Sequence, residues 1–260
     1  MKLFDAHNHI QDERIFPVLE KVMERARLAG ISGMAVKGCC ERDWSRVVEI
    51  ANRHPDACLA FGLHPWFIGG RSEQWSQRLE GLLTTYPQAS VGEVGIDHAI
   101  ENRNADDQER IFFKQLEIAH KYDRPVTIHC RRAWGRLIEL LDQFGELPCG
   151  MLIHCFGGSP EIAIELVKRG AYISFSGSIT RPNSRKAGPA IRAVPDDRIL
   201  IETDAPDIMP HGIVDAPSSV LNEPSNLGYV LAKAAELRGV SEEALAEITL
   251  CNAERFFFFS

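Results

Sequence analysis

Short apolar runs alternate with longer amphipathic segments from one end of the chain to the other. The runs have the length of buried strands, and each is followed by a segment whose apolar residues recur at helical spacing. The predicted strands cover residues 3–10, 31–36, 58–63, 90–94, 125–129, 150–154, 171–176 and 198–203. The predicted helices cover residues 15–29, 42–53, 73–86, 106–122, 133–144, 160–169, 186–194, 227–238 and 241–246.

Eight strands that alternate with helices predict a parallel sheet with right-handed crossover connections. In a chain of 260 residues, this number of units favours a closed (β/α)8 TIM-like barrel. An open, doubly wound sheet is the alternative, but no GxGxxG pattern follows the first strand. No linker interrupts the alternation, so we expect a single domain over residues 1–260. We expect the unusual run of phenylalanines at 256–259 to pack over the bottom of the barrel.

The composition is that of an ordinary globular protein, with 45% apolar and 25% charged residues. The first residues lack the apolar core of a signal peptide, and no apolar run is long enough to span a membrane. The seven cysteines are odd in number and show no CxxC spacing, which favours reduced thiols. We therefore expect a cytoplasmic enzyme without membrane contact, and no pattern requires a partner protein or more than a monomer.

The net charge of −7 argues against broad, non-specific binding of nucleic acid, because such binding relies on a basic surface. It leaves open a polyanionic substrate that is held locally by metal ions and a few arginines. The net charge therefore favours a local binding site for such a substrate over a broad basic surface.

Ionisable residues recur where the predicted strands end. His7 and His9 are two positions apart in the first strand, so their side chains project to the same side. Histidines and carboxylates at four later strand ends would join them at one face of a barrel, where the active sites of this fold lie. Imidazole nitrogen and carboxylate oxygen bind zinc and similar ions. The predicted metal ligands are His7, His9, Glu93, His129, His154 and Asp204.

Six ligands exceed what a single zinc ion takes, whereas they suit a pair of divalent ions with a bridging carboxylate. We expect the first-strand histidines and Asp204 at one ion, and His129 and His154 at the other. Glu93 would lie between the two ions.

Three further residues are candidates for contact with substrate. His64 lies in the loop after the third strand and could contact a phosphate or orient a ligand, with a plain loop-capping role as the alternative. Arg131 and Arg132 follow His129 closely, so at least one could reach the mouth of the pocket and bind phosphate. The alternative for both arginines is a solvated charge at the start of a helix.

The ordered segments DAHNHI, GLHPW, VGEVGID, VTIHC, LIHCFGG, ILIETDAP and NEP resemble the TatD family of metal-dependent hydrolases, in the amidohydrolase superfamily. The resemblance implies a TIM-like barrel, a site for divalent ions such as Mg²⁺, Mn²⁺ or Zn²⁺, and deoxyribonuclease activity. In this family the activity is commonly exonucleolytic on single-stranded DNA from the 3′ end. The family's metal-binding positions fall on His7, His9, Glu93, His129, His154 and Asp204.

Two segments depart from the family pattern. Leu221 stands before Asn222-Glu223-Pro224, where the family often has arginine, and the loop over residues 207–219 is this chain's own. Both lie where substrate contacts are expected. The resemblance therefore carries over the metal chemistry more safely than the identity of the substrate.

The expected mechanism is attack on phosphorus by a metal-activated water, with Asp204 as the general base. Glu93 is the second expected catalytic residue, because it would hold both ions. Two other classes stay open: a metal-dependent hydrolase of a small amide, ester or lactone, favoured by the acidic net charge, and a non-catalytic binding protein. A complete ligand set that includes Asp204 argues against the non-catalytic class.

Overall fold

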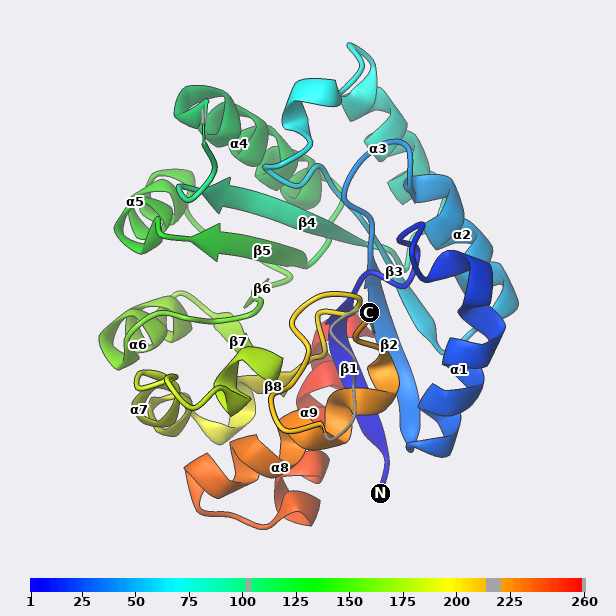
Figure 1. Cartoon of the computed structure of the whole chain (residues 1–260). Coiled ribbons are helices and arrows are strands. Elements are labelled where there is room, and N and C mark those ends of the chain that lie inside the picture. Colours follow the sequence, from blue (N-terminus) through cyan, green and yellow to red (C-terminus); the bar gives the residue numbers. More distant parts are fainter. Residues whose placement is uncertain (102–103, 214–220, 259–260) are drawn as a thin grey trace.

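The computed structural model describes residues 1–101, 104–213 and 221–258. Eight strands form one sheet in the order β1 to β8, and the neighbouring strands pair in parallel, with helices on the outside (Figure 1). The strands are β1 (Leu3–Asn8), β2 (Ile31–Lys37), β3 (Ala57–Phe61), β4 (Ser90–Asp97), β5 (Val126–Arg131), β6 (Met151–Ile153), β7 (Ala171–Phe175) and β8 (Ile199–Ile201). The predicted (β/α)8 barrel is confirmed.

Helices follow the strands throughout the described chain. They are α1 (Leu19–Leu28), α2 (Trp44–Arg53), α3 (Trp75–Thr85), α4 (Ala105–Lys121), α5 (Trp134–Phe144), α6 (Pro160–Lys168), α7 (Ala187–Ala193), α8 (Leu227–Arg238) and α9 (Glu242–Phe257). Short 3-10 turns are η1 (Phe16–Val18), η2 (Ile68–Gly70), η3 (Gly177–Thr180), η4 (Asp196–Arg198) and η5 (Pro224–Asn226). None of these described helices has both the length and the apolar character needed to cross a bilayer.

The last predicted helix was too short. It was expected to stop at residue 246, whereas α9 runs to Phe257. The buried face of α9 continues through Thr249 and Asn252, whose polar side chains interrupt the apolar pattern in the sequence. Both find acceptors, since Thr249 Oγ1 donates to the carbonyl of Leu245 and Asn252 Nδ2 donates to the carbonyl of Ile199.

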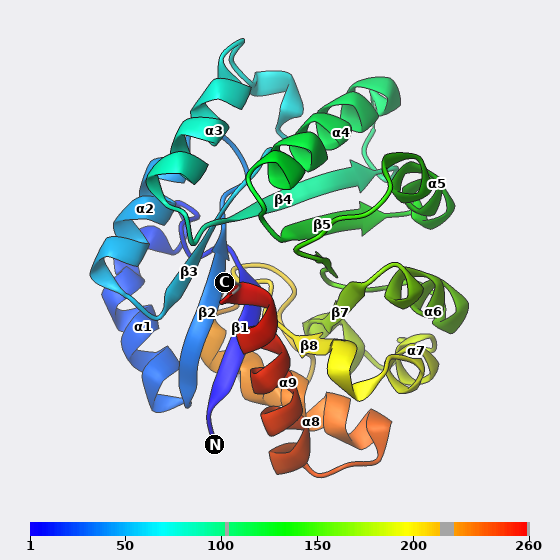
Figure 2. The same ribbon diagram turned by 180° about the vertical axis from the view of Figure 1, so that it is seen from behind.

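The bottom of the barrel is closed by α9, which lies across the N-terminal ends of the strands (Figure 2). Phe256 and Phe257 are buried there, as expected for the phenylalanine run, and the Phe257 ring stacks on Phe4 with 5.2 Å between centroids. Phe258 is exposed, and residue 259 lies outside the described residues. The apolar layer that these rings join consists of Phe4, Ala6, Ala35, Leu152, Leu200 and Ala253.

At the opposite end, backbone hydrogen bonds join the first and last strands just beyond β8. The N–H of Asp204 donates to the carbonyl of His7 at 3.0 Å, and the N–H of His9 donates to the carbonyl of Ala205 at 2.6 Å. Three of the predicted metal ligands are therefore fixed relative to one another by the closure of the barrel itself.

Candidate metal centre

The carboxylate of Glu93 is the centre of the predicted ligand set. We predicted Glu93 at the end of its strand, which is wrong, because β4 continues to Asp97. The pairing of β4 with β5 is instead interrupted between Val91 and Val94, and the N–H of Glu93 donates to the carbonyl of Gly38. Such irregularities re-aim a side chain within a strand. Here the local break turns the carboxylate of Glu93 into the barrel.

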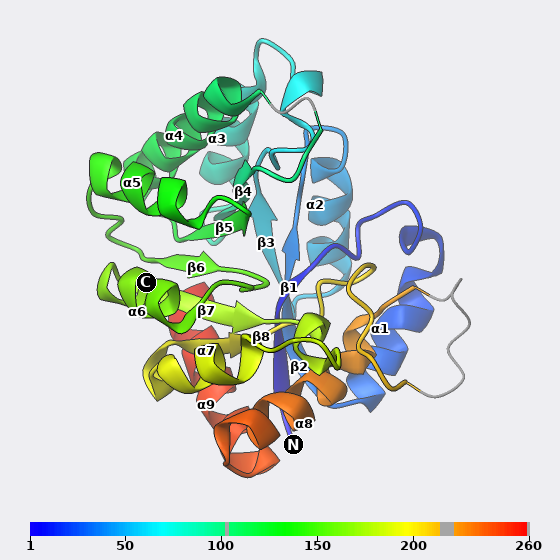
Figure 3. The same ribbon diagram turned by 60° about the vertical axis from the view of Figure 1, so that its left-hand side comes forward.

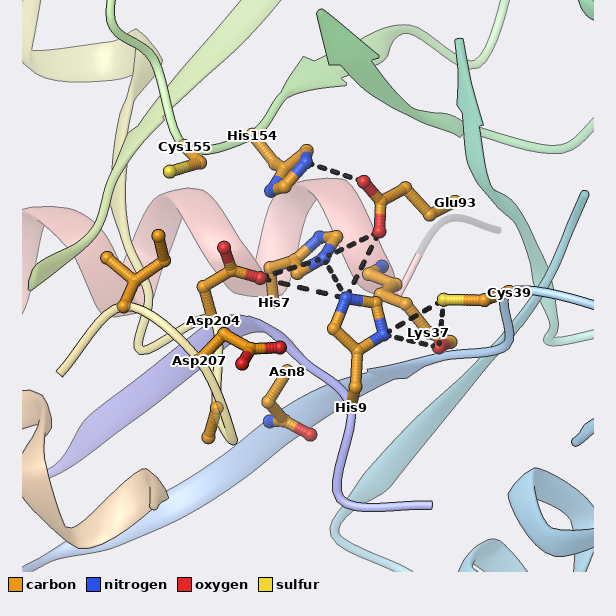
Figure 4. Close-up of polar contacts among 12 residues, drawn as sticks. His7, Asn8, His9, Lys37, Cys39, Glu93, His154, Cys155, Asp204 and Asp207 are labelled. Carbon is orange, nitrogen blue, oxygen red and sulfur yellow. Dashed lines mark hydrogen bonds and ion pairs between the residues drawn. The ribbon is translucent and has the colours of Figure 1, made fainter. Parts of the chain in front are cut away.

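One group of donor atoms surrounds Oε2 of Glu93 (Figure 4). This oxygen lies 3.2 Å from His7 Nε2 and 3.1 Å from His9 Nε2, and the two imidazole nitrogens are 3.0 Å apart. Asp204 Oδ1 lies 3.7 and 3.6 Å from the same nitrogens. Four donor atoms from β1 and the residue that follows it, from β4 and from the segment after β8 thus converge on one point.

A second group surrounds the other oxygen of the same carboxylate. Oε1 of Glu93 lies 2.7 Å from His154 Nε2, 3.0 Å from His129 Nδ1 and 3.3 Å from His64 Nε2. The His129 and His154 nitrogens are 3.2 Å apart. His64 is buried and lies among these donors, and its Nδ1 accepts from the N–H of Trp66 at 3.1 Å, which is the loop-capping contact given above as the alternative.

The spacing of both groups fits a bound cation. An ion that holds nitrogen and oxygen at about 2.0–2.2 Å in a tetrahedron keeps its ligand atoms about 3.3–3.6 Å apart. The distances above are close to that range. Each ion would take two histidines and one oxygen of Glu93, and the number and identity of the ions stay a prediction.

Each of three ligand histidines has a partner behind its ring. His9 Nδ1 lies 2.8 Å from the carbonyl of Lys37, so this nitrogen donates and leaves Nε2 free to bind an ion. His129 Nε2 lies 3.2 Å from Oδ2 of Asp97. Partners of this kind fix the orientation and tautomer of metal-binding histidines.

The third partner is Glu202, a fully buried carboxylate. Its Oε1 lies 3.3 Å from His154 Nδ1, within ion-pair distance but off the line of a hydrogen bond. The same oxygen accepts from the N–H of Cys155 at 2.6 Å, and Ser174 Oγ donates to Oε2. Strand alternation gave a signal for Glu202, because this inward position comes two residues before Asp204.

The site separates the pKa values of its two acids. Burial alone would raise the pKa of Glu93, but the surrounding charges of His154, His64 and His7 outweigh it and hold that pKa well below its usual range. Burial raises the pKa of Asp204 to about 6. Asp204 also has a left-handed backbone, with φ 55°, and keeps its side chain 14% exposed, so it faces the mouth.

The segment after β8 is held in place by Asn222 of the NEP motif. Its buried side-chain amide donates to the carbonyls of Thr203 and Asp207, each at 2.8 Å. The side chain of Glu223 does not join the donor groups, and its Oε2 lies 2.6 Å from Nη2 of Arg25. The motif therefore positions the loop that carries Asp204, and its glutamate lies outside the donor groups.

Residues 4–258 match the family described as TatD related DNase. The chain belongs to the TatD family. It is 32% identical over 255 residues to a metal-dependent hydrolase, YabD, of Bacillus subtilis, with 98% of each chain covered. It is also 32% identical over 263 residues to the 3′-5′ ssDNA/RNA exonuclease TatD of Salmonella typhimurium, again with 98% of each covered.

Solved structures agree with this membership. The TatD homologue YjjV of Escherichia coli superimposes with a TM-score of 0.92 at 29% identity, and 99% of this chain and 98% of that chain are covered. A hydrolase of the TatD family from Entamoeba histolytica has a TM-score of 0.88 at 20% identity, which shows the shared fold. This TatD-family chain is therefore an enzyme, a metal-dependent hydrolase.

Proposed function

We propose that this TatD-family enzyme hydrolyses phosphodiester bonds and removes nucleotides from the 3′ end of single-stranded DNA. The observation that carries the proposal is the position of Glu93, whose two oxygens each face a separate group of histidines. Two cations held by one carboxylate in this way suit in-line displacement at phosphorus. All donors come from one chain, and we propose that a monomer is sufficient.

When bound, two divalent cations supply a nucleophilic water near neutral pH and neutralise charge on the phosphate. Asp204 accepts the proton of the attacking water, because Oδ1 faces the first donor group while the side chain keeps access to the mouth. The new P–O bond forms as the bond from phosphorus to the 3′ oxygen breaks. That oxygen takes up a proton, and a nucleoside 5′-monophosphate leaves.

The arginines favour a polyanionic substrate over a small amide or ester. Most described arginines pair with carboxylates or carbonyls, but six form no hydrogen bond or ion pair with any described residue through their side chains. Five of the six lie at the last residue of a strand or in a loop that follows one, which is the end of the barrel where the donor groups lie. The sixth, Arg255, lies on α9. Unpaired guanidinium groups bind phosphate well. The five at the ends of the strands are Arg42, Arg131, Arg132, Arg181 and Arg185.

Single-stranded DNA labelled at either end tests the proposal. The protein is stripped with chelator, reloaded with Mg²⁺, Mn²⁺ or Zn²⁺, and compared with Asp204→Asn. We expect stepwise loss of nucleotides from the 3′ end, and a loss of turnover of at least a hundredfold in the variant, because its amide cannot accept the proton.

Two outcomes would contradict the proposal. Failure of the folded, metal-loaded enzyme to cut any nucleic acid would exclude the nuclease and turn attention to small amides, esters and lactones. Near-normal turnover by Asp204→Asn would exclude the assigned base while leaving the substrate class intact.

A further inference from the structure

A cavity of about 520 Å³ opens between the loops that follow β7 and β8. Both loops lie at the C-terminal end of the barrel (Figure 3). One wall carries Arg181 and Asn183, and the other carries Met209, Pro210 and His211. The volume is in the range of small-ligand sites.

The walls of this cavity are held by specific contacts. The N–H of His211 donates to Thr180 Oγ1 at 2.6 Å, and Asn226 Nδ2 lies 3.7 Å from the sulfur of Met209. Gly177 allows the two loops to approach, since a Cβ at this position would lie 2.3 Å from the carbonyl oxygen of Ile208. The cavity is therefore shaped before any ligand arrives.

The lining combines one cation with apolar surface. Arg181 is exposed, and its guanidinium has no partner among the described residues. Met209 and Pro210 supply apolar contact, and His211 adds a flat ring. Apolar and aromatic walls accept a nucleobase, while a free guanidinium binds a phosphate in a bidentate manner. These are the two parts of a nucleotide.

The cavity also lies within reach of the reaction. Met209 is five positions after Asp204, and five residues span at most about 17 Å when fully extended. The segment between them is folded back, because the N–H of Asp207 donates to the carbonyl of Asp204. A strand whose terminal phosphate lies at the metal centre can therefore reach the cavity with one of its next few nucleotides.

We propose that this cavity binds a nucleotide of the single-stranded substrate upstream of the scissile bond, with Arg181 on its phosphate and its base against Met209 and Pro210. The inference rests on the proposed nuclease function. It predicts that the enzyme prefers strands long enough to occupy the metal centre and the cavity at the same time. A phosphodiester too small to reach the cavity uses the metal centre alone.

Arg181→Gln tests the cavity, and Arg255→Gln is the matched control. Arg255 is exposed on α9, at the opposite end of the barrel, so both variants change the net charge equally. Hydrolysis of a pentanucleotide and of bis(p-nitrophenyl) phosphate is measured for each variant. Binding of a fluorescent pentanucleotide is measured by anisotropy in the presence of chelator, where no cleavage occurs.

We expect Arg181→Gln to raise KM and Kd for the pentanucleotide about tenfold, because one charge-assisted contact is lost. The slope of log Kd against log salt should fall by about 0.7, which corresponds to one phosphate contact on a single strand. Hydrolysis of bis(p-nitrophenyl) phosphate should stay within twofold of wild type. Arg255→Gln should leave all of these values unchanged.

The cavity proposal is overturned by three results. These are an unchanged Kd and salt slope for Arg181→Gln, an equal loss with both substrates, or no binding of the pentanucleotide by wild type. If pentanucleotide hydrolysis by wild type continues while Arg181→Gln has no effect, only the cavity assignment fails. If wild type hydrolyses the small diester but no nucleic acid, the proposed function fails as well.

Discussion

The ligand histidines of this centre owe their orientation to atoms that would never touch a bound ion. A carbonyl oxygen of β2 lies behind His9, the carboxylate of Asp97 lies behind His129, and the carboxylate of Glu202 lies behind His154. Trp66 Nε1 in turn donates to Asp97 at 2.7 Å. At the scale of single residues, three imidazoles of the site therefore have a partner behind the ring, as metal-binding histidines commonly do.

Glu202→Gln should weaken metal binding by ten- to a hundredfold. The substitution keeps the shape of the side chain and an acceptor for the N–H of Cys155, and its amide N–H can donate to Ser174 Oγ in place of accepting from it, but it removes the negative charge beside His154. Affinity is measured by competition with a chromophoric chelator, which needs no turnover. The same variant should lose activity that excess metal partly restores.

Glu223→Gln is the control for this experiment. It removes an equal charge from a carboxylate that pairs with Arg25, outside the donor groups. Its metal affinity should match wild type. An unchanged affinity in Glu202→Gln would show that the contact with His154 contributes nothing to binding.

At the scale of elements, the loops after β7 and β8 act as one unit. Gly177 begins η3, and a side chain there would meet the backbone of Ile208 and Pro210, on the segment that carries Asp204. Gly177→Ala should therefore destabilise the protein by about 1–3 kcal/mol, as overpacking does elsewhere. It should also lower kcat, because the base is displaced. Urea unfolding and nuclease assays measure the two effects.

Gly81→Ala separates this effect from the ordinary cost or gain of replacing glycine. Gly81 lies inside α3, and nothing lies within 4 Å of the Cβ position. Alanine should stabilise that helix by about 0.5–1 kcal/mol and leave kcat unchanged. If Gly177→Ala behaved like Gly81→Ala, the two loops would be less tightly packed than their distances indicate.

The sequence predicted the elements of this barrel well, because regular periodicity is a local property. The eight strands were found, and so was the convergence of the six ligand positions on one region. The break in β4 at Glu93 could not be found, because it arises from the way β4 pairs with β5. The burial of His64 beside Glu93 was missed for the same reason, since a loop histidine shows no sign of the carboxylate it will meet.

At the scale of the whole molecule, the barrel encloses a charge between its active end and its closed end. Lys37 is the last residue of β2 and is fully buried, and its Nζ lies 4.5 Å from the centre of the Phe257 ring. Burial lowers the pKa of Lys37 from 10.5 to about 7, against the attraction of nearby groups that include Glu202 and Glu93. A lysine in this position reduces stability but places positive charge beneath the acids of the site.

Lys37→Met should stabilise the fold, and the gain should depend on pH. Between pH 7 and 10.5 the unfolded chain holds a proton that the folded chain has released, so wild-type stability rises with pH in this window. Below pH 7 wild type carries the full cost of burial, on the order of 5 kcal/mol. Urea unfolding in chelator should therefore show a gain of that order at pH 6 and about 1 kcal/mol at pH 10. The carbonyl oxygen of residue 37 still accepts from His9 in the variant.

Lys21→Met, at an exposed position on α1, controls for the general effect of removing a lysine and should change stability by less than about 0.5 kcal/mol at either pH. A gain for Lys37→Met of equal size at pH 6 and pH 10 would mean that the lysine titrates alike in the folded and unfolded chains. Water or an acid would then have to reach Nζ between the site and the phenylalanine layer. A gain that shrinks as pH rises would instead identify Lys37 as a charge that the barrel retains at the expense of stability, directly beneath Glu93 and Glu202.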